Sequence, residues 1–448
     1  MITIAKYGLM LALFGQLYYL AAVHFVSFPR PAIATWSLVY LGTLAILFSA
    51  RGHAKLSRVD QLFALCAGWL VFSFAISGES SPSGFATMMA MYVIPPYVCA
   101  RLLGRYLGPR DFKLVYGLML CMLPLMLAEY VRDPTLFQDV DRLRIFNAED
   151  EKNLLQGGTA FFTAYLFGGA LVVAASNLTL PKEDRHAIGF GSRRLHLAVA
   201  GISATVVLLW GSRGAILALV ALLGLIGLWR MRYAPMKLAA GGLVAACLLV
   251  AGYFLLPPGR QALINDFGSA FTAFGGMPVC VTEGSSVLAH LTLAQEGFRL
   301  WSQSPLFGVG ASNFGLYWCG TRTEFASPHS TPLHILTEMG ILGLIPWLLL
   351  YGSLLNLSVR HAASMSARDR VVTRHLVLLW GYTFLQLVTG GNIFSDYHLY
   401  IFTGLLAATL VRYEGSPRPP ALRRHDSATA PQLGLRAPNA ALYSSRYP

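Results

Sequence analysis

One arginine of the sequence stands where a positive charge is costly. Arg213 belongs to a Gly211-Ser212-Arg213-Gly214 motif between two strongly apolar runs with almost no loop between them. An arginine at a bilayer boundary either snorkels to water or has a partner. Its guanidinium can also grip a phosphate through two parallel hydrogen bonds, and the flanking glycines would let a bulky anion approach the backbone. The motif leaves two interpretations open, a snorkelling side chain at a tight turn or an anion site.

Three further polar residues gather at the start of an apolar run. His329 lies just before the run and Glu338 lies a turn or more inside it. A glutamate on an apolar helix must be paired, hydrogen-bonded or neutral, and His334, four residues earlier, shares its helix face. A histidine at an interface is often only an amphipathic anchor, but it is also suited to act as a base near neutral pH. We expect a catalytic role for His329 and supporting roles for His334 and Glu338, with structural roles as the alternative.

Two other polar groups are harder to assign. Asn392, Asp396 and His398 cluster between the last two apolar runs, and we expect them to form a solvated polar turn. Cys280 and Cys319 share the one long polar loop. A disulfide between them is plausible if that loop faces an oxidising compartment.

The elements that must position these residues are membrane helices. Of the 448 residues, 55% are hydrophobic and only 12% are charged, whereas about a quarter are charged in a soluble domain. Runs such as 215–229 are apolar on every face, which favours helices over barrel strands. The net charge of +13 comes from basic residues in short loops, a pattern that fits the positive-inside rule better than nucleic-acid binding. The sequence predicts an all-α polytopic membrane protein.

About twelve transmembrane spans are predicted, with both termini cytoplasmic. The expected spans are 5–25, 33–50, 61–78, 85–103, 113–131, 159–177, 195–211, 214–229, 236–256, 335–355, 375–391 and 397–412. Two outside segments are long, 132–158 and about 257–332, and the second holds amphipathic, helix-like sequence over 288–301. Residues 1–412 are expected to form the transmembrane domain, and 413–448 a disordered cytoplasmic tail.

Three motifs in a fixed order carry a resemblance to a known family. They are Gly-Ser-Arg-Gly at 211–214, Pro-Leu-Phe-Gly-Val-Gly-x-x-Asn-Phe at 305–314, and Pro-His-Ser-x-x-Leu-x-x-Leu-x-Glu-x-Gly-x-x-Gly at 328–343. Their order and spacing resemble the bacterial O-antigen ligase and polymerase superfamily over roughly residues 200–345. The span count, the cytoplasmic termini and the large periplasmic loop extend the resemblance over most of the chain.

The resemblance implies a GT-C type glycosyltransferase that needs neither metal nor other cofactor. It would work on the periplasmic face of the bacterial inner membrane, among membrane lipids, in lipopolysaccharide biosynthesis. As a ligase it would move a glycan from undecaprenyl pyrophosphate to a sugar hydroxyl of lipid A–core. Carried onto this chain, Arg213 would hold the donor pyrophosphate, and His329 would activate the acceptor hydroxyl or bind the donor phosphate.

The chain departs from the family pattern at two places. Many members carry a second arginine ahead of the Pro-Leu-x-Gly turn, where this chain has His290. The candidates that could replace that arginine are Arg142, Arg144, Arg260 and Arg299. The family often shows His-Asn where this chain has His329-Ser330.

Other functions share part of this pattern. An O-antigen or exopolysaccharide polymerase uses the same donor with a second lipid-linked glycan as acceptor, and the shared motifs do not separate it from a ligase. An oligosaccharide ligase acting on protein is a third enzyme. A flippase or transporter for a lipid-linked sugar would need charged residues lining a path in mid-span, and few are present. A purely structural scaffold would leave Arg213 and Glu338 without a role. We therefore rank the ligase first, the polymerase second and the transporter third.

Overall fold

In the computed structural model of the protein, every described element is a helix. The described residues are 2–15, 18, 56–77, 82–132, 162–210, 213–231, 286–317, 327–362, 364–390, 392–394 and 396–414. A helix satisfies its own backbone hydrogen bonds, which an apolar segment in lipid must do. The predicted all-α class is confirmed for this part of the chain.

The helices follow the apolar runs of the sequence. The α-helices are α1 (Ile2–Phe14), α4 (Arg58–Ser77), α5 (Pro82–Met88), α6 (Ile94–Leu103), α7 (Lys113–Arg132), α9 (Gly169–Leu178), α10 (Arg193–Trp210), α11 (Arg213–Met231), α14 (Ser286–Gln303), α15 (Phe314–Tyr317), α16 (Thr331–His361), α17 (Ala367–Gly390) and α18 (Tyr397–Leu410). Two π-helical turns, η1 (Met89–Val93) and η5 (Ala164–Gly168), precede α6 and α9, and the 3₁₀ turns are η2 (Gly104–Tyr106), η3 (Pro109–Phe112) and η6 (Lys182–Ala187).

Five helical segments in the described residues are long and apolar enough to cross a membrane. They are Arg58–Ser77, Pro82–Tyr106, Pro109–Ala128, Thr331–His361 and Ala367–Val388. Every predicted span coincides with a helix where the structure describes it, except that 33–50 and 236–256 lie outside the described residues. The chain is therefore a multi-pass helical membrane protein.

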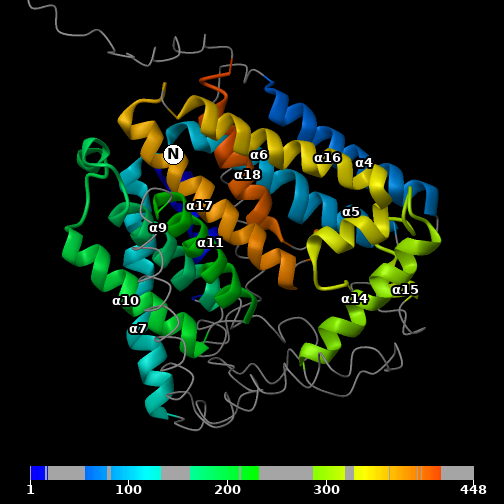
Figure 1. Cartoon of the computed structure of the whole chain (residues 1–448), viewed down its shortest axis with the longest axis horizontal. Helices are drawn as coiled ribbons and strands as arrows, with labels where there is room; N and C mark the ends of the chain where they lie inside the picture. The colour runs from blue at the N-terminus through cyan, green and yellow to red at the C-terminus, as the bar shows by residue number, and fades with distance from the viewer. Residues whose placement is uncertain are drawn as a thin grey trace, which may run out of the picture. The chain divides into compact units, whose positions relative to one another are not determined.

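The last helix, α18, lies at the centre of the bundle (Figure 1). All its residues are buried, which is why it is apolar on every face. It packs against α6 and η2, and a glycine lies on each side of this contact. A Cβ at Gly104 would overlap the Ala408 side chain, and a Cβ at Gly404 would overlap the Tyr97 carbonyl oxygen. Small residues are the usual means of close helix packing in membranes, where little hydrophobic force acts between helices.

The other helices form pairs around this centre. α4 packs along α16, α10 along α9, and α11 along α17, as Figure 1 shows for the labelled ribbons. At the contact of α11 with α17, Leu222 faces Gly381. Arg213 is carried by α11, His290 by α14, and His334 and Glu338 by α16, and His329 lies just before α16.

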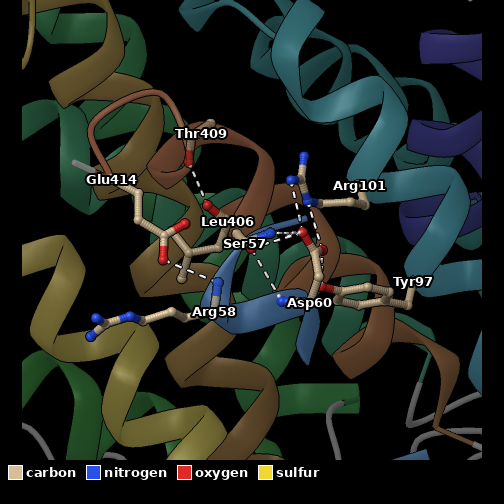
Figure 2. Close-up of polar contacts among 8 residues, drawn as sticks. All are labelled: Ser57, Arg58, Asp60, Tyr97, Arg101, Leu406, Thr409 and Glu414. Carbon is tan, nitrogen blue, oxygen red and sulfur yellow. Dashed lines mark hydrogen bonds and ion pairs between the residues drawn. The ribbon is translucent and has the colours of Figure 1, made fainter. Parts of the chain in front are cut away.

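A largely buried carboxylate, Asp60, joins α4 to α6 at one end of the bundle (Figure 2). Asp60 accepts hydrogen bonds from the Ser57 backbone N–H at 2.8 Å and from the Tyr97 hydroxyl at 2.7 Å. The Arg101 guanidinium binds both oxygens of Asp60, at 2.8 and 2.9 Å. Asp60 thus caps α4 and fixes it to α6 at once.

Further ion pairs lie at the same end, which is called the ion-pair end below. They are Lys6–Asp111, Arg370–Asp184 and Arg412–Asp369. Arg412 also donates to the carbonyl of Arg105, close to Arg101, so these pairs belong to one region. Glu414 accepts from the Arg58 backbone N–H at 3.1 Å, as Figure 2 shows.

Candidate active site

The helix that follows His329 is interrupted at a glycine. Within α16, Gly340 has φ 66° and ψ −171°, a conformation that a residue with a Cβ avoids. In an unbroken helix the N–H of Ile341 would donate to Thr337 and that of Leu342 to Glu338. The break at Gly340 frees these two donors and two acceptors in an apolar region, where each must find another partner.

The turn at 305–310 supplies those four partners. The N–H groups of Val309 and Gly310 donate to the carbonyls of Thr337 and Glu338, each at 2.9 Å. The N–H groups of Ile341 and Leu342 donate to the carbonyls of Pro305 and Leu306, at 3.0 and 3.2 Å. The turn formed by the Pro-Leu-Phe-Gly-Val-Gly motif therefore supplies the hydrogen-bond partners that α16 lacks at Gly340.

Glycines line this contact because the two backbones touch. A Cβ at Gly308 would overlap the Glu338 carbonyl carbon, and a Cβ at Gly340 would overlap the Leu306 carbonyl oxygen. Gly310 meets the side chain of Ser77 on α4 in the same way. All three glycines also have positive φ. Gly308 and Gly340 thus serve the contact between the turn and α16, and Gly310 serves the contact between the turn and α4.

Glu338 holds the far side of the same turn. Its carboxylate accepts the backbone N–H of Ser312 at 2.7 Å and that of Phe314 at 2.9 Å. His334 Nε2 lies 3.2 Å from its Oε2, so the pair expected from the i+4 spacing is present, although no aligned hydrogen bond forms. Glu338 is 1% exposed. A glutamate on an apolar helix must be paired, hydrogen-bonded or neutral. In the structure, backbone N–H groups of the turn donate hydrogen bonds to the Glu338 carboxylate.

His329 lies next to this interlocked region and is exposed to solvent. Its φ is 50°, in the left-handed region that few residues other than glycine adopt. Before it, Pro328 packs over Gly297 of α14, and after it α16 begins at Thr331. Thr337 donates to the Gly297 carbonyl at 3.0 Å, which ties α16 to α14. The histidine is therefore an exposed side chain on a strained backbone between two anchored elements.

The motifs that form this arrangement also match a known family. Residues 198–348 match the O-antigen ligase family. The resemblance drawn from the motifs is confirmed over this segment. No curated protein matches the chain. The O-antigen ligase domain runs from α10 through α11, α14 and α15 into α16, so it contains both sides of the contact at Gly340.

Arg213 is the first residue of α11 in the O-antigen ligase domain. Near the start of α10, His196 lies 3.0 Å from the Tyr116 hydroxyl, and Gly189 before it lies against Arg110 at the ion-pair end. Because α10 begins near that end and crosses the bundle, α11 begins at the opposite end. The Arg213 side chain lies outside the described residues.

The start of α16 lies at the same end as Arg213. The turn between α17 and α18 is at this end, since Asp369, in the first turn of α17, lies at the ion-pair end. Phe394 of that turn packs edge-on against His334, with 5.3 Å between ring centres. The structure therefore brings His329, His334 and Glu338 to one end, together with the backbone of Arg213.

The remaining candidates for pyrophosphate binding are only partly described. His290 lies on α14, but its side chain is outside the described residues. The positions outside the description altogether are Arg142, Arg144, Arg260, Cys280 and Cys319. Arg299 is described, and its guanidinium binds both oxygens of the buried Glu296 at 2.5 and 2.6 Å. This pair raises the pKa of Arg299, so the guanidinium keeps its charge but already has a carboxylate partner.

The turn between α17 and α18 is buried, so the expectation of a solvated polar turn was wrong. Asp396 and His398 are 6% and 1% exposed. The His398 ring stacks on Tyr165 of η5 with 3.8 Å between ring centres. Asp396 accepts the Asn392 backbone N–H at 2.6 Å, and burial raises its pKa to about 7. Sequence analysis missed this because the burial comes from η5, which is distant along the chain.

Metal ligands were not found in the described part of the site. Within the described ranges, His, Cys, Asp and Glu side chains form no group that could hold a metal ion.

Proposed function

We propose that the protein is an O-antigen ligase, a glycosyltransferase that moves a glycan from undecaprenyl pyrophosphate to a sugar hydroxyl of lipid A–core. The observation that carries the proposal is the position of His329 in the O-antigen ligase domain. It is the exposed histidine beside a buried, hydrogen-bonded scaffold, and its backbone is strained. Strained backbone of this kind is concentrated at functional sites.

The chemistry requires a base and a stabilised leaving group. His329 would take the proton of the acceptor hydroxyl, whose oxygen attacks the anomeric carbon of the donor. The bond between that carbon and the pyrophosphate oxygen breaks, and the bonding electron pair leaves with undecaprenyl pyrophosphate. Arg213 would stabilise the charge that develops on the leaving group, which arginine can do permanently and without a metal.

The other candidates take secondary roles in this proposal. A second cation for the pyrophosphate would come from His290, Arg142, Arg144 or Arg260. Glu338 and His334 would support the site by holding the turn that braces α16. In the proposed reaction the protein uses no cofactor.

The orientation follows from charge. Arg105, Arg110, Arg368 and Arg412 lie at the ion-pair end, and loops rich in arginine and lysine face the cytoplasm. This end would therefore be cytoplasmic, with both chain termini, and the site would open to the periplasm at the inner membrane. Residues 1–412 would form the GT-C type transferase domain and 413–448 a cytoplasmic tail.

The test is transfer by the purified protein. Undecaprenyl-pyrophosphate-linked glycan is incubated with lipid A–core in EDTA, using the wild type, His329→Ala and Arg213→Ala. The proposal expects glycosylated lipid A–core that survives EDTA and is lost in both variants. Longer glycans on the polyprenyl carrier, with lipid A–core untouched, would show a polymerase instead. Absence of transfer to any acceptor would favour a transporter.

A further inference from the structure

The end of helix α14 and the turn after it expose three large apolar side chains. Phe298, Leu306 and Phe307 are 53%, 55% and 43% exposed. The same stretch also exposes the polar side chains of Arg299 and Gln303. Large apolar side chains exposed beside polar ones are typical of a segment at a membrane interface, where headgroups meet acyl chains.

Aromatic contacts lie on both sides of the turn. The rings of Phe298 and Trp301 meet edge-on, with 6.4 Å between centres, and Trp301 Nε1 donates to the Pro305 carbonyl at 3.2 Å. On the other side of the turn, Phe307 stacks on Trp69 of α4, with 6.4 Å between centres. One ring pair therefore lies on α14, and the other joins the turn to a transmembrane helix.

The surface beyond Trp69 is one that faces lipid. Phe72 and Ile76 of α4 are exposed, as are Ile341 and Ile345 of α16. Both helices are long and apolar enough to span a membrane. The apolar surface of the turn is thus continuous with the lipid-facing surface of the bundle.

The length of α16 gives the depth of the turn. Its apolar stretch 341–359 ends at Arg360, a residue expected at the membrane boundary. At about 1.5 Å per residue, some 20 residues cross the ~30 Å hydrocarbon core, which puts Gly340 near the opposite boundary. The turn binds α16 at Gly340, and Phe307 contacts α4 at Trp69, well before that helix ends at Ser77. Both helices therefore place the turn at the boundary of the hydrocarbon core or inside it.

The backbone of the turn is built for a place without water. Every N–H from Gly308 to Phe314 donates to an acceptor within the protein. The acceptors include the Ser73 hydroxyl and the two oxygens of Glu338. Non-helical backbone at membrane depth is tolerated only when its polar groups are satisfied in this way. An ordinary loop in water would not need each of these bonds.

We propose that the end of α14 and the turn after it insert the side chains of Phe298, Leu306 and Phe307 into the membrane, where they contact phospholipid acyl chains. The turn is then a re-entrant element, and it holds the start of α16, with His329, at the height of the lipid headgroups. The lipid contact does not depend on the transferase activity. Only the consequence for His329 rests on the proposed function.

Photocrosslinking in a bilayer tests the insertion. p-Benzoylphenylalanine is placed at position 298, 306 or 307 of the full chain, in nanodiscs of phosphatidylethanolamine and phosphatidylglycerol without polyprenyl lipid. Position 348 on the lipid-facing side of α16 is the positive control, and the exposed Glu183 at the ion-pair end is the negative control. Mass spectrometry of the irradiated protein reports the partner.

The expected result is a phospholipid adduct through an acyl chain at 298, 306 and 307, as at 348, and its absence at 183. The proposal is overturned if 348 labels lipid but the three turn positions do not, or if they crosslink to a second copy of the chain. Thermal unfolding identifies any variant that has lost its fold. Position 298, more than half exposed, provides the test if a label at 307 disturbs the stack on Trp69.

Discussion

The backbone N–H of Gly310 donates to the carbonyl of Glu338 at 2.9 Å, in the place that the N–H of Leu342 would take in an unbroken helix. In the same way, the N–H of Val309 donates to the carbonyl of Thr337, in the place that the N–H of Ile341 would take. The turn and α16 are therefore one hydrogen-bonded unit, and a change on either side is expected to affect both. Two motifs of the O-antigen ligase domain meet in this unit.

Gly340→Ala is expected to destabilise the protein strongly. The new Cβ would overlap the Leu306 carbonyl oxygen, and the residue would have to keep φ 66°. Strain and overpacking together should cost about 3 kcal/mol or more. Gly352→Ala is the matched control, because it lies in the same helix and a Cβ there has nothing within 4 Å. Thermal unfolding in detergent should show a large loss for the first variant only, and equal losses would contradict the proposed contact.

Glu338→Gln is expected to destabilise the turn although it keeps the size of the side chain. The amide has one oxygen for two backbone N–H donors, so either Ser312 or Phe314 loses its acceptor. A buried amide without a partner costs about 1–3 kcal/mol. Glu183→Gln, at an exposed position, controls for the loss of a charge. Unfolding temperatures of the two variants give the comparison, and a Glu338→Gln protein as stable as the wild type would show that its carboxylate is dispensable.

Sequence reasoning found the residues of the site more readily than their contacts. The i+4 spacing of His334 and Glu338 predicted their contact because both lie on one helix. The N–H groups of Ser312 and Phe314 could not be predicted as partners, since they belong to an irregular turn 24 and 26 residues away along the chain.

The roles of some motif residues also depend on tertiary contacts. Gly340 was visible as part of a motif, but only the approach of Leu306 explains why a glycine is required there. Asp396 was misjudged for a similar reason. A polar turn is expected to be exposed to solvent, but it is buried when another element of the fold covers it. The positions of the transmembrane spans were predictable because each span must be a run of apolar residues long enough to cross the membrane.

The pair Asp60–Arg101 is expected to show strong coupling in a double-mutant cycle. Arg101→Met leaves the Asp60 carboxylate buried without its cation, which should cost about 3–5 kcal/mol. Adding Asp60→Asn should recover part of that loss, because no charge then remains to be compensated. Arg412→Met, which removes a more exposed partner of Asp369, should cost only about 1 kcal/mol. Chemical denaturation of the four proteins of the cycle would measure the coupling, and simple additivity would contradict it.

Burial of Asp396 is expected to make stability depend on pH. Its pKa is raised from 3.8 to about 7, so the folded state holds the proton more tightly than the unfolded state. The contribution of Asp396 to the free energy of unfolding is therefore fully present below pH 3.8, its ordinary pKa, and is lost as the pH rises through about 7. Asp396→Asn should therefore have a flatter pH dependence of unfolding temperature and gain on the wild type towards alkaline pH. A constant difference between the two proteins over that range would exclude Asp396 as the cause.

His329→Gly should separate stability from activity. Glycine adopts φ 50° freely, whereas histidine pays about 1–2 kcal/mol for it, so the variant is expected to unfold at the same or a higher temperature. The proposed base is absent, so transfer to lipid A–core should be lost. His329→Asn is the matched control, because asparagine tolerates the left-handed region but cannot act as a base near neutral pH. It should be equally inactive and close to the wild type in stability. Activity retained in the glycine variant would remove His329 from the mechanism, and a stable, inactive variant would show that the strained conformation is kept for the imidazole it presents.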